Sequence, residues 1–225
     1  MGQCFAIVYN MQLYCIVFMK NKIELAYNHL SKDTIMSFLI KKFKNKIDWG
    51  SRYNSNFALS IANLIIEQQI SFKAAITIKK RFSKIIQGKS ESEIINMSKL
   101  EIQSIGISFR KAEYIKNVFN FFYLETKTID FDKMSDKEVI NYLISIKGVG
   151  EWTAQMFLIF NLFRQDVFSP KDLALINSIK KNYSLQLVGK SEIEKLTKNW
   201  APYNSVACLL LWESVENKVF YKGSK

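Results

Sequence analysis

The chain has 225 residues, of which 48% are hydrophobic, so it can bury one large core or two smaller cores packed together. Only two prolines and eight glycines are available, too few for a many-stranded β fold with its frequent turns. The three cysteines form no Cys-x-x-Cys pair, and with a single histidine they exclude most metal sites, including a four-thiolate iron–sulfur cluster. No disulfide framework is expected, so the expected location is the reducing cytoplasm.

The formal net charge of +12 favours a polyanionic partner, and nucleic acid is the first candidate. Most of the cations are lysines, and a lysine-rich surface is also what a biased genome produces. Charge therefore favours a nucleic-acid partner without deciding it.

The first 18 residues are an extension of uncertain role. No residue from Gly2 to Met19 is charged, and the segment lacks the basic start of a signal peptide. It also falls short of the roughly 20 uninterrupted apolar residues that cross a bilayer. A strand pair packed on the rest of the chain is one interpretation. A second hypothesis is that translation starts at Met19, since the sequence after it resembles an ordinary N-terminus.

Apolar residues recur at helical spacing through almost all of the remaining chain, which predicts an all-α fold. Two capping-box patterns, Ser135-x-x-Glu138 and Ser191-x-x-Glu194, mark helix starts. The predicted helices are 33–43, 56–69, 71–82, 92–97, 99–104, 108–123, 135–146, 151–163, 170–183, 191–200 and 203–217.

A tight turn, Lys147-Gly148-Val149-Gly150, joins two of these helices. Glycine permits positive φ and a close approach of backbone to a ligand. The amides that open the next helix, at Glu151, favour an anion such as a phosphate, and Lys147 adds charge beside it. The alternative is an ordinary corner in which the glycines only allow close helix packing.

The turn and its surroundings resemble the helix-hairpin-helix (HhH-GPD) DNA glycosylase superfamily, and within it the 3-methyladenine DNA glycosylase II branch. The resemblance covers about residues 26–217. The segments that carry it are Leu143-x-x-Ile-Lys-Gly-Val-Gly-x-Trp-Thr-Ala, Asp166-Val-Phe-x-x-x-Asp172, Glu67-Gln-Gln-Ile-Ser71, Gly106-x-Ser-x-x-Lys-Ala-x-Tyr-Ile115, and Trp200-x-Pro-Tyr-x-Ser-x-Ala207 with Trp212.

The resemblance implies a two-lobed fold of the endonuclease III type. Residues 54–131 would form the middle lobe. Residues 19–53 and 132–225 would form the second lobe, with both the hairpin and the catalytic aspartate.

Asp172 is the predicted catalytic residue. On local sequence alone it belongs to a helix start, with Ser169 as N-cap, Pro170 at the first helical position and Asp172 at the third. The resemblance places the family's catalytic aspartate at this position, where a fixed anion would stabilise the positive charge that develops on the sugar and orient water. Asp166 is expected to shape the preceding loop.

Other positions of the resemblance define the expected pocket and DNA contacts. Bifunctional relatives carry a lysine two residues after the second hairpin glycine, and Trp152 stands there instead, which predicts a monofunctional enzyme without lyase activity. Asn204 replaces a common arginine of the family, with the possible loss of an ion pair. The expected pocket residues are Trp152, Trp212, Met156 and Leu173, and the expected DNA contacts are Lys147, Gly148, Val149, Gly150, Glu151 and Gln69.

Three of these expectations have alternatives. Each tryptophan can equally be a core residue, and Met156 and Leu173 depart from the tyrosines that relatives often carry. Gln69 is expected to fill the gap left by a flipped nucleotide, although some relatives use leucine there.

The expected function is hydrolysis of the N-glycosidic bond of alkylated purines in base excision repair. The alternatives are a glycosylase for deaminated or oxidised bases and a non-catalytic helix-hairpin-helix module. No cofactor and no side-chain metal site are expected; a monovalent cation on hairpin carbonyls between Ile146 and Glu151 is the one exception considered. The expected partner is double-stranded DNA with damaged bases, bound by a monomer without a membrane.

Overall fold

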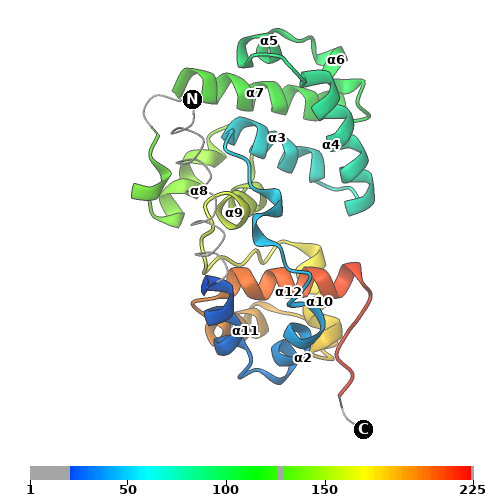
Figure 1. The fold of residues 1–225 in the computed structure, drawn as a ribbon, viewed down its shortest axis with the longest axis vertical. Helices are drawn as coiled ribbons and strands as arrows, with labels where there is room; N and C mark the ends of the chain where they lie inside the picture. Colours follow the sequence, from blue (N-terminus) through cyan, green and yellow to red (C-terminus); the bar gives the residue numbers. More distant parts are fainter. Residues whose placement is uncertain (1–20, 126–128, 224–225) are drawn as a thin grey trace, which may run out of the picture. The chain divides into compact units, whose positions relative to one another are not determined.

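The computed structural model describes residues 21–125 and 129–223, and all regular secondary structure in these ranges is helical (Figure 1). The expectation of an all-α fold is confirmed. No helix in the described ranges is long and apolar enough to cross a membrane. The extension 1–18 and the hypothetical start at Met19 lie outside the described residues.

Contacts divide the chain into two compact units. Unit 1 contains the described residues up to Arg52 and those from Arg164 onward, and unit 2 is Tyr53–Phe163. The predicted middle lobe instead ends at Phe131, and the hairpin was predicted in the other lobe. The difference arises because the second hairpin helix packs on the first helix of unit 2, which holds the hairpin in that unit.

Unit 2 is built around its first helix, α3, which packs against α4, α7 and α9. Its aromatic core includes the edge-to-face rings of Phe57, Phe131 and Phe157, whose centroids lie 5.4 Å apart in each pairing. The helices are α3 (Phe57–Glu67), α4 (Phe72–Ile86), α5 (Glu91–Asn96), α6 (Lys99–Gln103), α7 (Phe109–Glu125), α8 (Asp136–Ile144) and α9 (Glu151–Phe160), with a 3₁₀ turn at Phe131–Lys133.

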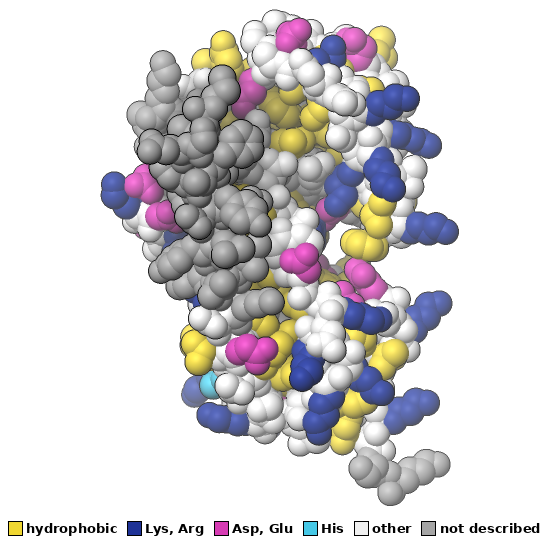
Figure 2. All heavy atoms as spheres, in the orientation of Figure 1, with side chains coloured by type: hydrophobic (Ala, Val, Ile, Leu, Met, Phe, Trp, Pro, Cys, Tyr) yellow, Lys and Arg dark blue, Asp and Glu magenta, His cyan; other side chains and the backbone are white. Residues whose placement is uncertain are grey.

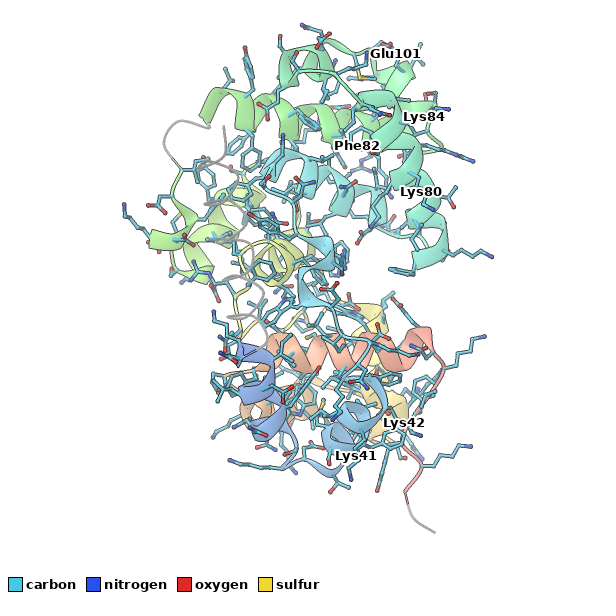
Figure 3. The ribbon with its side chains drawn as sticks, viewed as in Figure 1. Lys41, Lys42, Lys80, Phe82, Lys84 and Glu101 are labelled. Carbon is cyan, nitrogen blue, oxygen red and sulfur yellow. The ribbon has the colours of Figure 1, made fainter. Side chains whose placement is uncertain are left out.

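The helix α4 has one buried face and one exposed, basic face. Phe82 is completely buried and contacts the ring of Phe119, whereas Lys80 and Lys84 lie on the outer side of α4 (Figure 3). Figure 2 shows dark blue side chains gathered along this edge of unit 2. The positive charge expected from the composition is thus partly concentrated on one helix face.

Unit 1 is built around α12 (Asn204–Glu216), which packs against α2, α10 and α11. All residues from Asn204 to Leu211 are buried, so this helix forms the centre of the unit. The other helices are residues 21–30, α2 (Thr34–Phe43), α10 (Leu173–Asn182) and α11 (Lys190–Trp200), with a 3₁₀ turn at Trp49–Arg52.

Two predicted helix starts need correction. The capping box at Ser135 and Glu138 is present as predicted. The one at Ser191 and Glu194 is wrong: α11 begins one residue earlier, and the carboxylate of Glu192 accepts the backbone N–H of Gly189 at 3.1 Å. The helix α10 begins at Leu173 rather than Pro170.

Candidate active site

The two hairpin glycines differ in their surroundings. Gly148 has φ +107°, and a Cβ atom there would lie 2.2 Å from Cγ of Tyr114 on α7. Gly150 has an extended conformation with φ −99°, and a Cβ atom there would meet nothing within 4 Å. Gly148 therefore allows the hairpin to pack closely against Tyr114 of α7, and Gly150 leaves open space at the start of α9.

The start of α9 is suited to an anion. Gly150 is the N-cap and offers no side chain to the amides of the first turn. Glu151, in this first turn, is exposed, whereas Val149 is buried and anchors the turn in the core. Because its side chain is buried, Val149 can make the expected contact with DNA only through its backbone.

Lys147 lies beside this turn and is tied to α7. Its Nζ is 2.8 Å from Oε1 of Glu113, and 72% of its side chain is exposed. The amide of Asn117, also on α7, donates to the Lys147 carbonyl at 3.2 Å. The hydrogen bond and charge of Lys147 lower the pKa of Glu113, and Glu113 in turn raises the pKa of Lys147. The acid thus offsets the one cation of the hairpin.

We expect Glu113→Gln to strengthen DNA binding, because it removes the anion beside Lys147. The dissociation constant for duplex DNA at low salt should fall by about two- to threefold, with a steeper salt dependence. Fluorescence anisotropy titrations at several salt concentrations measure both quantities.

The control is Glu101→Gln in α6, which removes an exposed carboxylate of the same unit (Figure 3). Glutamine can keep the hydrogen bond that Glu101 accepts from the N–H of Ser98. An equal gain in both variants would assign the effect to net charge rather than to Lys147.

Gln69 lies in the turn between α3 and α4, and its side chain is exposed. Its φ of +58° is left-handed, which is rare for a residue with a side chain. The ammonium of Lys111 donates to the carbonyls of Ile66, at 2.9 Å, and of Gln68. The side chain of Gln68 donates to Oγ1 of Thr153 in α9, at 2.9 Å.

Sequence reasoning assigned no role to Lys111 or Gln68. Both belong to segments that carry the family resemblance, which is the only signal that could have drawn attention to them. Their partners lie far away in the sequence, so no local pattern reveals them.

The two expected pocket residues of unit 2 differ in exposure. Trp152 is half-buried in the first turn of α9. Met156 is only 1% exposed, so its side chain belongs to the core of the unit rather than to an open wall.

In unit 1, Asp172 is the N-cap of α10 and is 8% exposed. Its Oδ1 atom accepts the backbone N–H of Leu175 at 2.9 Å and the indole N–H of Trp212 at 3.4 Å. Asp172 was predicted at the third helical position, and it is instead the N-cap, so Pro170 lies before the helix. Two donors on one oxygen orient the carboxylate.

The residues that surround the carboxylate of Asp172 are buried. Its backbone N–H donates to the carbonyl of Ser169 at 3.1 Å, and both Ser169 and Cys208 are completely buried. Burial, and then the charge of Asp172, raise the pKa of the Cys208 thiol well above its usual value. Both effects favour the protonated thiol, which is the less nucleophilic form. Leu173, next along the chain, is 77% exposed.

The loop before Asp172 is held by the start of α12. The amide of Asn204 donates to Oδ1 of Asp166 and, at 3.1 Å, to the carbonyl of Thr197. The hydroxyl of Ser205 accepts the N–H of Val167 at 3.1 Å. Asp166 thus helps to shape the loop, as expected, through its hydrogen bond with Asn204.

The candidate residues fall into two groups, one in each unit. Gln69, Trp152 and the hairpin belong to unit 2, and Asp172, Leu173 and Trp212 belong to unit 1. In unit 2 the side chain of Gln68 donates to the Gly148 carbonyl of the hairpin, and in unit 1 the indole N–H of Trp212 donates to Asp172. No cluster of His, Cys, Asp or Glu suited to a metal ion occurs among the described residues.

Known proteins resemble the chain over most of its length. The DNA-3-methyladenine glycosylase of Saccharomyces cerevisiae is 30% identical over 195 residues, which is 70% of this chain and 66% of that protein. A Bacillus subtilis protein named as a candidate DNA-3-methyladenine glycosylase is 30% identical over 162 residues, 68% of this chain and 56% of its own length. The chain therefore spans between about half and two thirds of these two relatives.

A solved structure gives a fuller match. The 3-methyladenine DNA glycosylase of Schizosaccharomyces pombe, determined in complex with abasic DNA, matches with a TM-score of 0.79 and 27% identity. The match covers 88% of this chain and 99% of that structure. The family model described as HhH-GPD superfamily base excision DNA repair protein matches residues 62–202, which include Gln69, the hairpin and Asp172. The chain thus belongs to the HhH-GPD superfamily of base excision DNA repair proteins.

Proposed function

We propose that this protein is a monofunctional DNA glycosylase that hydrolyses the N-glycosidic bond of alkylated purines of the 3-methyladenine type. The observation that carries the proposal is the carboxylate of Asp172, nearly buried and oriented by Leu175 N–H and Trp212. The names of the relatives support the substrate class, and abasic DNA, bound by the Schizosaccharomyces pombe enzyme, is the product of such a reaction.

DNA binding is proposed to depend on unit 2. The open approach at Gly150 and the amides at the start of α9 suit one phosphate, and Lys147 adds a positive charge. Gln69, exposed in its left-handed turn, is proposed to fill the space of the flipped nucleotide. Because these contacts are largely electrostatic, binding should weaken steeply as salt rises.

The chemistry is proposed to depend on Asp172. An alkylated purine already carries positive charge, so it leaves as a neutral base and takes the bonding electrons with it. Positive charge then develops on the sugar, and the fixed anion of Asp172 stabilises it. Water adds its oxygen to C1′ and gives up a proton, for which Asp172 is the proposed acceptor. The aromatic faces of Trp152 and Trp212 suit a cationic base.

The proposed enzyme has no lyase step, because that step needs an amine to form a Schiff base with the sugar. Trp152 has no amine at the position where bifunctional relatives carry lysine. Lys147 precedes the glycines and is paired with Glu113. The amine of Lys111 donates to two backbone carbonyls of α3 and its turn.

Three further points are part of the proposal. A monovalent cation is proposed to bind hairpin carbonyls between Ile146 and Glu151, because the Ile146 and Gly148 carbonyls each accept one hydrogen bond and keep a second lone pair. The protein is proposed to act as a monomer. Its substrate places it with the cell's DNA, which in a bacterium is the nucleoid in the cytoplasm.

The test is base release from methylated duplex DNA by the purified protein, with strand breaks scored before and after alkali. We expect free 3-methyladenine, and breaks only after alkali treatment. Breaks before alkali would contradict the monofunctional assignment. Tight DNA binding without release of methylated bases would favour another lesion or a non-catalytic binding module.

A further inference from the structure

The exposed Gln69 has a backbone conformation that is rare for a residue with a Cβ atom. Its φ of +58° is disfavoured for a residue with a Cβ atom, so surrounding contacts must stabilise it. Because the side chain of Gln69 is exposed, the stabilising contacts must be made to the neighbouring backbone.

Lys111 supplies those contacts from another helix. Its ammonium, on α7, donates to the carbonyls of Ile66, at 2.9 Å, and of Gln68, at the C-terminal end of α3. This end of a helix carries unsatisfied carbonyls and partial negative charge, which a cation complements. Partial burial lowers the pKa of Lys111. The hydrogen bonds fix the carbonyl immediately before Gln69.

Gln68 connects the same turn to the hairpin. Its side-chain amide donates to Oγ1 of Thr153, at 2.9 Å, and to the carbonyl of Gly148, at 3.3 Å. The backbone of Gln68 is thus held by Lys111, while its side chain holds the phosphate-binding turn. All of these contacts lie within unit 2.

We propose that Lys111 and Gln68 form a clamp that sets the position of Gln69 relative to the hairpin. When the hairpin binds a phosphate of the DNA, Gln69 then enters the space left by the flipped nucleotide. Both are positioning residues and neither touches the reacting atoms. The proposal rests on the proposed function, because it assumes that Gln69 occupies the space of a flipped nucleotide.

The clamp is tested by comparing the binding of damaged and undamaged DNA, an experiment in which no base is released. The measured quantity is the ratio of dissociation constants for undamaged duplex and for the same duplex with a tetrahydrofuran abasic-site analogue, from anisotropy titrations. Lys111→Met should reduce this ratio by about tenfold, because charged-group hydrogen bonds hold the turn, while affinity for undamaged DNA stays within about threefold. Lys111→Arg, which keeps the charge and donors, should retain most of the ratio.

A double-variant test of Lys111 and Gln69 distinguishes a positioning role of Lys111 from a general effect on stability. Gln69→Ala should reduce the ratio similarly, and the double variant with Lys111→Met should lose little more, since both changes remove the same event. Should Lys111→Met fail to fold, Gln68→Met cuts the other end of the clamp and is expected to give the same loss.

The matched control is Lys116→Met. Lys116 is also part-buried on α7, and its ammonium donates to the carbonyl of Met97, the C-cap of α5. This variant should leave the ratio unchanged. An equal loss in Lys116→Met, additive losses in the double variant, or no lesion preference in the wild type would each overturn the clamp. A wild type that prefers the abasic analogue but releases no methylated base would contradict the proposed function alone.

Discussion

Asp172→Asn is expected to abolish base release while the protein still binds DNA. The single-turnover rate of 3-methyladenine release should fall by about a thousandfold or more, because the substitution removes the anion that stabilises charge on the sugar. Asparagine is as good an N-cap as aspartate, and its side-chain oxygen can still accept the N–H of Leu175. Fold and DNA affinity should therefore remain close to those of the wild type, within about threefold for affinity.

Asp33→Asn is the matched control for this experiment. Asp33 is also an N-cap aspartate of unit 1, and its Oδ1 accepts the N–H groups of Ile35 and Met36 at 2.8 and 3.0 Å. Its other oxygen accepts the hydroxyl of Tyr183 at 2.7 Å. This variant should keep full base release, with thermal denaturation reporting any loss of stability. If Asp172→Asn retained a tenth or more of the wild-type rate, Asp172 would be only a helix cap.

The position of Asp172 illustrates what sequence can and cannot predict about a helix. Apolar periodicity located the body of α10, and the resemblance selected Asp172 over Asp166. Its capping position could not be predicted, because a backbone turn from Asp172 to Ser169 places Pro170 before the helix. Propensity alone favoured proline at the first helical position.

The start of α11 shows a second limit. Two pairs of residues here have a glutamate three positions after a possible N-cap. The pair predicted from the sequence is Ser191 with Glu194. The structure uses Gly189 with Glu192, although glycine has no side chain to complete the exchange. Local patterns do not decide between such pairs, because both offer a glutamate at the third helical position.

The organisation of the site was harder to predict than its members. The hairpin was recognised from its own residues, but its assignment to a unit depends on the contact of α9 with α3. Lys111 and Gln68 were missed because their hydrogen bonds join residues 43 to 85 positions apart in the sequence. Such contacts have no local signature.

Gly148→Ala is expected to damage the fold of unit 2 and, with it, DNA binding. Its Cβ atom would lie 2.2 Å from Cγ of Tyr114, and φ is +107°. Backbone strain and overpacking each contribute about 1–3 kcal/mol, so we expect the free energy of unfolding to fall by about 3 kcal/mol or more. Chemical denaturation measures this loss. Weaker DNA binding by this variant would therefore not by itself show that the hairpin contacts phosphate.

Gly150→Ala separates the two roles of the hairpin. At φ −99° alanine is unstrained, and its Cβ atom would meet nothing within 4 Å, so the stability should stay within about 1 kcal/mol of the wild type. If a phosphate approaches the backbone at this point, the added methyl group should weaken binding of damaged and undamaged duplexes alike, by about tenfold. Anisotropy titrations with both duplexes measure the effect. Unchanged affinity would place the phosphate elsewhere, and Gly148 would then serve only its close contact with Tyr114 of α7. A loss confined to damaged DNA would instead assign Gly150 to the recognition of the lesion.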